Sequence, residues 1–510
     1  MIKNLARVYS AELEGIDAKL IEVEADLNIG LHSFNIVGLA DKALNEAKER
    51  VNSALKNSGI KPPNRENRKI TINLAPADIK KTGSQYDLAI ALGYLLATKQ
   101  IKEFETRDKI FLGELALDGR LRPVNGALSI SQMAAELHFA YIFLPSENAN
   151  EAAVIENIAV IPLEKLEDVI SFLEERKNII PKVFKEGDNE KSQTPDFSEI
   201  KGQDNAKRAL MIAAAGSHNI LMTGPPGVGK SFLAQSLAGI LPSLTTREAI
   251  EITKIWSAVG LDPHGLIRKR PFRAPHQTAS TVALIGGGTD PKPGEISLAH
   301  RGVLFLDELP GFQKNTLEAL RQPIESGVVH IARAKNSFIF PSKFTLVAAM
   351  NPCPCGYYGT ADRECKCSAY EVIKYQKRIS GPLLDRIDLQ IRAGSVKIDE
   401  LRKIKCPEPV NDAIKRKVDS AREMQRTRFT AHNLKIETNS EMSSHEVDEM
   451  INLGTDAEKF LGTLDKSWLS PRSYYRILKV ARTIADIEGK EIIEAEHLAE
   501  AFSYRVREEI

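Results

Sequence analysis

A glycine-rich segment near the middle of the chain constrains its fold more than any other feature. Residues 224–231, Gly-Pro-Pro-Gly-Val-Gly-Lys-Ser, match the spacing GxxxxGK[ST]. The apolar run 219–223 precedes them, and Leu233, Leu237 and Ile240 follow on one face of a predicted helix. In a strand, loop and helix of this kind, backbone N–H groups converge on phosphate oxygens. The pattern predicts a nucleotide-binding loop formed by Gly224, Pro225, Pro226, Gly227, Val228, Gly229, Lys230 and Ser231.

Two carboxylates downstream complete the predicted chemistry. Lys230 would supply a fixed positive charge to the phosphates, and the Ser231 hydroxyl would ligate Mg²⁺. The apolar run 302–306 ends in Asp307 and Glu308, as expected of a buried parallel strand whose carboxyl end lies where an open α/β sheet binds ligands. We expect Asp307 to bind Mg²⁺ through water and Glu308 to polarise the water that attacks the γ-phosphate. The sequence thus predicts an ATPase that uses ATP and Mg²⁺.

The composition is that of a globular protein with several domains. The 510 residues are 43% hydrophobic and 27% charged, which suits roughly two to four domains. The formal net charge of +1 favours neither a nucleic acid nor a membrane as partner, so any basic surface must be local. No run of 18 apolar residues occurs, and no apolar core of signal-peptide length lies near the start. We therefore predict a cytoplasmic protein with no membrane partner.

Hydrophobic periodicity predicts a compact α/β domain over residues 1–175. A strand is expected at 34–39, followed by a helix whose apolar residues between 44 and 55 have helical spacing. Ile70, Ile72 and Leu74 alternate as in a second strand, and residues 87–98 are apolar enough to form a buried helix.

The rest of the chain divides into three predicted segments. Residues 176–195 are polar and aperiodic, as expected of a linker. Residues 196–394 contain the nucleotide-binding motifs and are predicted to form an α/β ATPase core with a parallel sheet. Residues 395–510 have mainly helical patterns, which predict a carboxyl-terminal helical lid.

Four segments of the first domain carry a family resemblance. Residues 34–40, 73–78, 83–88 and 113–119 resemble the amino-terminal domain of the magnesium-chelatase-like YifB/ComM family of AAA+ ATPases. The resemblance extends over essentially the whole chain. It implies a Lon-protease-like amino-terminal domain of the ribosomal S5 domain 2 type, an AAA+ P-loop core and a helical lid.

The resemblance to Lon-type domains raises the hypothesis of a protease. Such peptidases use a Ser nucleophile activated by a Lys, and the alignment places Tyr86 and Leu128 at these two positions. A phenol and an alkyl group leave no activated nucleophile. Ser84 lies nearby, but no Lys accompanies it near residue 128. We predict a scaffold or binding domain, not an active protease.

The same resemblance assigns further catalytic residues. Asn351 ends an apolar strand and matches the AAA+ residue that positions the attacking water; the alternative is a turn-forming Asn before Pro352. Arg386 lies in a segment that resembles the arginine finger of the chelatase branch, and the alternative is an ordinary ion pair. Arg472 follows a predicted helix start, Ser470-Pro471, and matches the second sensor of AAA+ lids, acting in cis or in trans.

Two basic segments are candidate DNA contacts. Two strands are expected at 328–334 and 336–340, and Arg333 and Lys335 at their turn would touch phosphates or simply form a solvated hairpin tip. Lys415, Arg416 and Lys417 begin the clearest basic concentration in the lid. They would bind a phosphate backbone or form a solvated charged face.

The cysteines form a compact pattern. Cys353, Cys355, Cys365 and Cys367 make two CxC pairs within a cysteine-rich loop, residues 353–367. Four thiolates in a short loop suit tetrahedral zinc, and the alternatives are free thiols or a redox pair. Cys406 stands alone and is predicted to be inert.

The resemblance finally implies a function. It suggests a homo-oligomeric ring, which we expect to be a hexamer, that acts on single-stranded or branched DNA. The activity it implies is that of a helicase promoting branch migration during natural transformation and homologous recombination. A protein-remodelling AAA+ ATPase and a chelatase-type ATPase subunit remain alternatives. The chain has no separate metal-binding domain or long acidic linker, which argues against the chelatase subunit.

Overall fold

A computed structural model describes most of the chain in two compact units. The described residues are 5–39, 41–65, 67–185, 194–261, 265–289, 291–332, 337–360, 363–394, 409–463 and 470–505. The first unit comprises residues 1–189 together with 246–267, and the second comprises residues 190–245 and 268–510.

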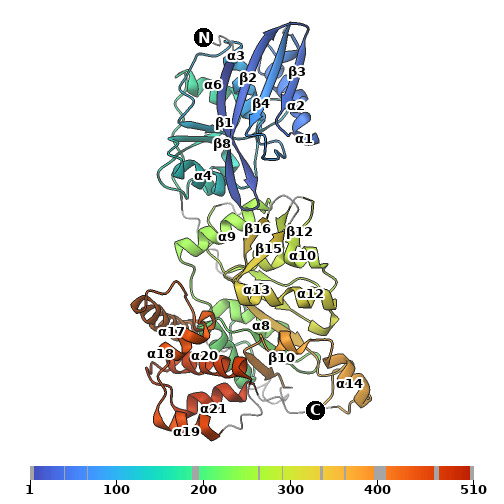
Figure 1. The fold of residues 1–510 in the computed structure, drawn as a ribbon, viewed down its shortest axis with the longest axis vertical. Helices are drawn as coiled ribbons and strands as arrows, with labels where there is room; N and C mark the ends of the chain where they lie inside the picture. The colour runs from blue at the N-terminus through green and yellow to red at the C-terminus, as the bar shows by residue number, and fades with distance from the viewer. Residues whose placement is uncertain are drawn as a thin grey trace. The chain divides into compact units, whose positions relative to one another are not determined.

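A seven-stranded mixed sheet forms the first unit, in the order β3-β4-β2-β1-β5-β8-β9. Its first two strands form a long antiparallel ribbon, visible in blue in Figure 1. The predicted alternation of Ile70, Ile72 and Leu74 is confirmed, since all three are buried in β4. The strands are β1 (Leu5–Glu14), β2 (Asp17–Ile29), β3 (Ser33–Val37), β4 (Arg68–Ala75), β5 (Lys109–Phe111), β8 (Tyr141–Pro145) and β9 (Ala159–Leu163), with a small hairpin of β6 (Glu114–Leu115) and β7 (Leu121–Arg122).

Helices bury the apolar side chains of this sheet. The predicted buried helix is confirmed as α3, whose residues are almost all inaccessible to solvent. The apolar spacing of residues 44–55 corresponds to two short helices, α1 and α2. The helices of this unit are α1 (Lys42–Asn45), α2 (Ala47–Asn57), α3 (Asp87–Ala97), α4 (Ala127–Glu136), α5 (Ala149–Ala152), α6 (Leu166–Leu173) and α9 (Thr246–Ala258), with 3-10 turns η1 (Pro63–Arg65) and η2 (Ser146–Asn148).

The second unit is built on a five-stranded parallel sheet in the order β11-β14-β17-β10-β18. Strands β14 and β17 are buried at every position, as the apolar runs in the sequence predict. The crossovers place the carboxyl ends of these strands at one edge of the sheet. The strands are β10 (Ile220–Thr223), β11 (Phe272–Arg273), β14 (Val303–Leu306), β17 (Thr345–Met350) and β18 (Leu389–Arg392).

Two small antiparallel ribbons and several helices surround this sheet. The predicted hairpin is confirmed by the pairing of β15 (Val328–Ala332) with β16 (Ser337–Pro341), and β12 (Gly286–Gly287) pairs with β13 (Lys292–Pro293). The helices are α7 (Asp204–Gly216), α8 (Lys230–Ile240), α10 (Thr281–Ile285), α11 (Glu295–Leu298), α12 (Lys314–Ala319), α13 (Arg321–Ser326), α14 (Ala369–Gln376) and α15 (Gly381–Leu384), with the 3-10 turn η3 (Leu309–Gly311).

The carboxyl-terminal helices form the predicted lid, and they share a hydrophobic core with the sheet. Phe429 of α17 and Ile484 of α20 belong to the same buried cluster as Ile220 and Leu237. Figure 1 shows these helices, drawn in brown and red, gathered into one group. They are α17 (Asn411–Ala431), α18 (Ser444–Met450), α19 (Thr455–Thr463), α20 (Pro471–Ile487) and α21 (Ala495–Ser503), with the 3-10 turn η4 (Asn439–Glu441).

Candidate functional site

The glycine-rich loop connects β10 to α8 at the carboxyl end of the parallel sheet. Gly227 and Gly229 have φ angles of +80° and +83°, a left-handed conformation that glycine adopts without the steric cost of a Cβ. Gly229 directly precedes the first turn of α8. The N–H groups of a first helical turn have no partner within the helix and are available to bind an anion.

Lys230 is buried at the start of α8 and is held by the loop itself. Its Nζ donates hydrogen bonds to the carbonyl oxygens of Gly224, at 2.7 Å, and Pro225, at 2.9 Å. A third bond, of 3.0 Å, goes to Oδ1 of Asn351. Burial lowers the pKa of Lys230, and this effect exceeds the opposing influence of the Asp307 and Glu308 carboxylates. The ammonium is thus oriented by neutral oxygens in a partly desolvated site.

The predicted magnesium ligands lie in contact with each other. Ser231 Oγ donates to Oδ2 of Asp307 at 3.0 Å, and Asp307 follows the last residue of β14. A hydroxyl and a carboxylate are hard oxygen donors, which Mg²⁺ prefers, so these two residues fit that ion. The N–H of Glu308 donates to Oδ1 of Asp307 at 2.9 Å. Glu308 itself is exposed and has a left-handed backbone, with φ of 49°.

Three neighbouring strands therefore bring four predicted residues to one place. Lys230 and Ser231 follow β10, Asp307 follows β14, and Asn351 follows β17. In the sheet, β17 lies between β14 and β10. Asn351 is thus positioned to contact both the phosphate-binding loop, through Lys230, and any group bound beside Asp307.

The two predicted arginines form a second cluster, centred on Glu325 of α13. Arg386 is buried, and its Nη2 lies 2.7 Å from Oε2 of Glu325. It also donates to the carbonyl oxygens of Arg321, at 3.1 Å, and Pro382, at 2.6 Å. Arg472 forms an ion pair with the same carboxylate, Glu325. The structure brings the two arginines together, and their side chains contact none of Lys230, Ser231, Asp307 and Asn351 among the described residues.

A hollow on the surface lies beside this arginine cluster. Its volume is about 500 Å³, and its lining is strongly charged. The lining residues are Glu318, Arg321, Gln322, Glu325, Ser326 and Arg386.

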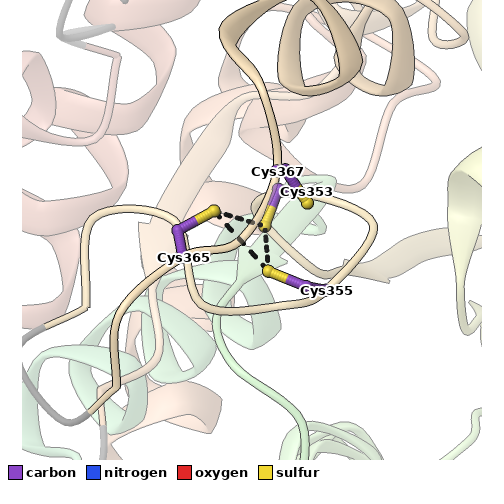
Figure 2. Close-up of side chains that lie close together, drawn as sticks. All are labelled: Cys353, Cys355, Cys365 and Cys367. Atoms are coloured by element: carbon purple, nitrogen blue, oxygen red, sulfur yellow. Dashed lines mark hydrogen bonds between the residues drawn. The ribbon is translucent and has the colours of Figure 1, made fainter.

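The four cysteines of the two CxC pairs also come together. The Sγ atom of Cys353 lies 3.4 Å from that of Cys355 and 3.6 Å from that of Cys365, and the last two are 3.5 Å apart. All four Sγ atoms lie within 4.8 Å of one another. Figure 2 shows Cys353, Cys355 and Cys365 pointing toward one another, with Cys367 beside Cys353. Cys406 lies outside the described residues.

Comparisons with known proteins identify the family of the chain. Residues 196–401 match the family model described as magnesium chelatase, subunit ChlI. Residues 23–148 match the model for subunit ChlI of Mg-chelatase, and residues 410–505 match its C-terminal model. The chain is 43% identical to competence protein ComM of Haemophilus influenzae, over 98% of this chain and 97% of that protein. The chain belongs to the magnesium-chelatase-like YifB/ComM family.

Two other relatives show how far the similarity extends. The protein YifB of Escherichia coli is 41% identical over 98% of this chain and 97% of its own length. The magnesium-chelatase 38 kDa subunit of Rhodobacter capsulatus is 27% identical over 31% of this chain and 50% of its own length. This YifB/ComM member is accordingly an AAA+ ATPase that uses ATP and Mg²⁺, of an oligomeric family. Among the helices of the described residues, none is long and apolar enough to cross a membrane.

The first unit of this YifB/ComM protein has a polar cluster at the position aligned with the Lon nucleophile. Tyr86 is fully buried and donates its hydroxyl to Glu12. Burial, together with the Glu12 charge, holds the pKa of this phenol well above its ordinary value. Leu128 is buried in α4, and Ser84 donates to Glu114. The hydroxyl groups of Tyr86 and Ser84 both donate to carboxylates. The absence of protease activity remains a prediction.

The candidate DNA contacts are placed only in part. Arg333 and Lys335 lie outside the described residues. In α17, Lys415 Nζ donates to Ser243 Oγ at 3.1 Å, whereas Arg416 and Lys417 are exposed. Two other basic residues of this helix form inward contacts: Arg422 donates to the carbonyl oxygen of Ala214, and Arg428 pairs with Asp486.

Sequence reasoning missed two carboxylates that organise the arginines. Glu325 lies between the recognised motifs and belongs to no pattern of its own. Asp388 is the last residue of the arginine-finger segment, contacts His218 Nδ1 at 3.2 Å and pairs with Arg476 of α20. Burial alone would raise the pKa of Asp388, but Arg476 and His218 outweigh it and hold this pKa well below its ordinary value. Through its ion pair with Arg476, Asp388 therefore holds the segment that contains Arg386 against the lid.

Proposed function

We propose that this protein is an ATP-driven ring motor that acts on DNA, as a helicase that promotes branch migration during natural transformation and homologous recombination. The observation that carries this proposal is the full-length similarity to a competence protein. The cluster of Lys230, Ser231, Asp307 and Asn351 supports the ATPase half of it. The DNA substrate, the hexameric ring and the cytoplasmic location are parts of the same proposal.

The side chains of the site suggest how each residue serves hydrolysis. Lys230 would turn from the loop carbonyls to the phosphate oxygens, and Asn351 would orient the attacking water. Exposed Glu308 would accept a proton from that water. Mg²⁺, held by Ser231 and by Asp307 through water, would neutralise phosphate charge.

We also propose that Arg386 and Arg472 act on the nucleotide of a neighbouring subunit. Both arginines are held by Glu325 and not by the residues around Lys230. An arginine supplied in trans neutralises transition-state charge only when the ring is assembled. In this arrangement Glu325 keeps the two arginines together in the absence of the neighbour's phosphate.

We further propose that Cys353, Cys355, Cys365 and Cys367 bind one zinc ion. The Sγ separations of 3.4–3.6 Å among Cys353, Cys355 and Cys365 are close to the spacing of about 3.8 Å that a tetrahedron with Zn–S bonds of about 2.3 Å requires. All four Sγ atoms lie within 4.8 Å of one another. They are far longer than a disulfide bond of about 2 Å. A donor set made only of sulfur favours zinc over Mg²⁺.

The ATPase rate measured with added DNA tests the proposed motor. Single-stranded, duplex and forked DNA would be added at several salt concentrations, with the Glu308→Gln variant as control. We expect stimulation that is strongest on single-stranded or forked DNA and that weakens with salt, because phosphate contacts release counterions. A rate indifferent to every DNA, but raised by unfolded protein, would instead favour a protein-remodelling ATPase.

A further inference from the structure

The cysteine loop begins directly at the candidate catalytic Asn351. Asn351 accepts a hydrogen bond from Lys230, and Cys353, two residues later, is fully buried. Strand β17 and β10 are paired up to the same point, and the N–H of Gly224 donates to the carbonyl oxygen of Met350 at 3.2 Å. Any displacement of Cys353 would therefore be transmitted through one intervening residue, Pro352, to Asn351.

The same loop also packs against the phosphate-binding loop. At Gly356, which has φ of +87°, a Cβ atom would lie 2.6 Å from Cδ of Pro226. This distance leaves no room for a side chain, so the backbone of the cysteine loop lies directly on Pro226. The N–H of Gly356 donates to the carbonyl oxygen of Cys353 at 3.0 Å. The turn from Cys353 to Gly356, which includes Cys355, thus sets the position of this contact.

The second CxC pair directly precedes α14 in the chain. Ser368, next to Cys367, caps this helix by accepting a bond from the N–H of Glu371. At the other end of α14, Gln376 donates to the carbonyl oxygen of Pro352 at 3.0 Å. Helix α14 therefore already connects Cys367 to Pro352. A metal ion that joined the two CxC pairs would add a second connection, which would hold Pro352 and Gly356 in place. The sulfur atoms of the two pairs lie close together between these segments (Figure 2).

We infer that zinc bound by the four cysteines fixes Asn351 and Pro226 in their working positions, so that ATP hydrolysis depends on the bound metal. The inference rests on the zinc site and the ATPase proposed above. Without an ion, four thiols provide only weak contacts, and closing the loop costs conformational entropy that metal binding offsets. Loss of the metal would loosen Asn351, whose amide must be placed accurately to orient water.

Variants of the ligands test whether metal and hydrolysis are linked. We expect the full-length wild-type protein, purified without chelator, to hold about one zinc per chain. The double variant Cys355→Ser and Cys365→Ser should hold none and should show a kcat for ATP lower by about tenfold or more. The matched control is Cys406→Ser, which should keep both zinc and kcat. Wild-type protein that holds no zinc, or a zinc-free variant with the wild-type kcat, would overturn the inference.

A second pair of variants tests the contact while leaving the ligands in place. Gly356 and Gly359 both have positive φ, but only at Gly356 would a Cβ meet another group. Gly356→Ala should keep its zinc yet lower kcat by about tenfold, because the new methyl group displaces Pro226. Gly359→Ala also places an alanine at a positive φ, of +67°, and should hydrolyse ATP within about twofold of wild type. Equal kcat values for the two variants would contradict the proposed contact.

Measurements of zinc content and kcat on the wild-type protein show whether the zinc inference or the proposed ATPase has failed. Wild-type protein that binds zinc but hydrolyses no ATP would contradict the ATPase. Removing zinc from wild-type protein with a chelator and adding it back should lower and then restore kcat. Wild-type protein that hydrolyses ATP equally well with and without zinc would leave the ATPase intact and overturn the inference.

Discussion

At the scale of single residues, Lys230 and Glu308 should separate nucleotide binding from hydrolysis. Lys230 is buried against the phosphate-binding loop, so Lys230→Ala removes the charge that would hold the phosphates. Glu308 is exposed, and its carboxylate is free to meet water. We expect Lys230→Ala to weaken ATP binding by about tenfold or more, and Glu308→Gln to bind ATP normally while kcat falls by about 100-fold or more.

Fluorescent-nucleotide titration and steady-state ATPase measurements check both expectations. The two variants serve as controls for each other, because each should lose a different step. Glu308→Gln protein with the wild-type kcat would show that another residue activates the water.

Asp388 should make the stability of the second unit depend on pH. Its pKa is depressed in the folded protein, so the carboxylate stabilises the fold above its unfolded pKa of about 3.9, and this contribution is lost as the pH falls through the lower, folded value. Asp388→Asn should therefore destabilise the fold at pH 7, by about 3 kcal/mol, because it removes the buried carboxylate that pairs with the partly buried Arg476. The difference should shrink below about pH 4.

Chemical denaturation of wild type and variant at pH 7 and at pH 3.5 measures this difference. A difference that stays constant over that range would show that Asp388 contributes through packing and not through its charge.

At the scale of secondary-structure elements, the start of α20 determines where Arg472 is held. Ser470 caps this helix, and its Oγ accepts a bond of 3.2 Å from the N–H of Ser473. Ser470→Ala should reduce the free energy of unfolding by about 1 kcal/mol, because the N–H of Ser473, which has no partner within the helix, loses its hydrogen bond to Ser470. Thermal unfolding measures the effect, and an unchanged midpoint would mean that the cap is not formed in solution.

The elements that could be predicted are those whose pattern is local. The apolar runs before Asp307 and Asn351 predicted β14 and β17, and the Ser-Pro pair predicted the start of α20. Because parallel strands end at the same edge, the meeting of Lys230, Ser231, Asp307 and Asn351 also followed from the sequence.

Contacts between distant residues could not be predicted in this way. Glu325 joins Arg386 and Arg472 from a short helix that has no motif of its own. The contact of Gly356 with Pro226 joins segments more than a hundred residues apart, and helix α9 belongs to the first unit although the sequence places it after the phosphate-binding loop. Such contacts depend on the packing of the folded chain and leave no periodic pattern in it.

At the scale of the whole molecule, the proposed action of Arg386 in trans predicts complementation between subunits. Arg386→Ala and Glu308→Gln proteins should each be almost inactive alone. In rings co-assembled from equal amounts, about one quarter of the interfaces would combine an intact Glu308 with a neighbour's intact Arg386, so about one quarter of the wild-type ATPase rate should return.

The ATPase rate of the co-expressed mixture, compared with each variant alone, checks this prediction. A mixture that is as inactive as its components would place Arg386 in the same site as its own Glu308. The matched mixture of Glu308→Gln with Lys230→Ala should stay inactive, since both changes damage the subunit that binds the nucleotide.

In the proposed function, ATP hydrolysis drives the protein along DNA. The most direct test is strand displacement from a forked or branched DNA by the wild-type protein with ATP, using Lys230→Ala as the inactive control. We expect displacement by wild type that requires ATP and is lost in Lys230→Ala. Wild-type protein that hydrolyses ATP yet leaves every branched DNA intact would contradict it.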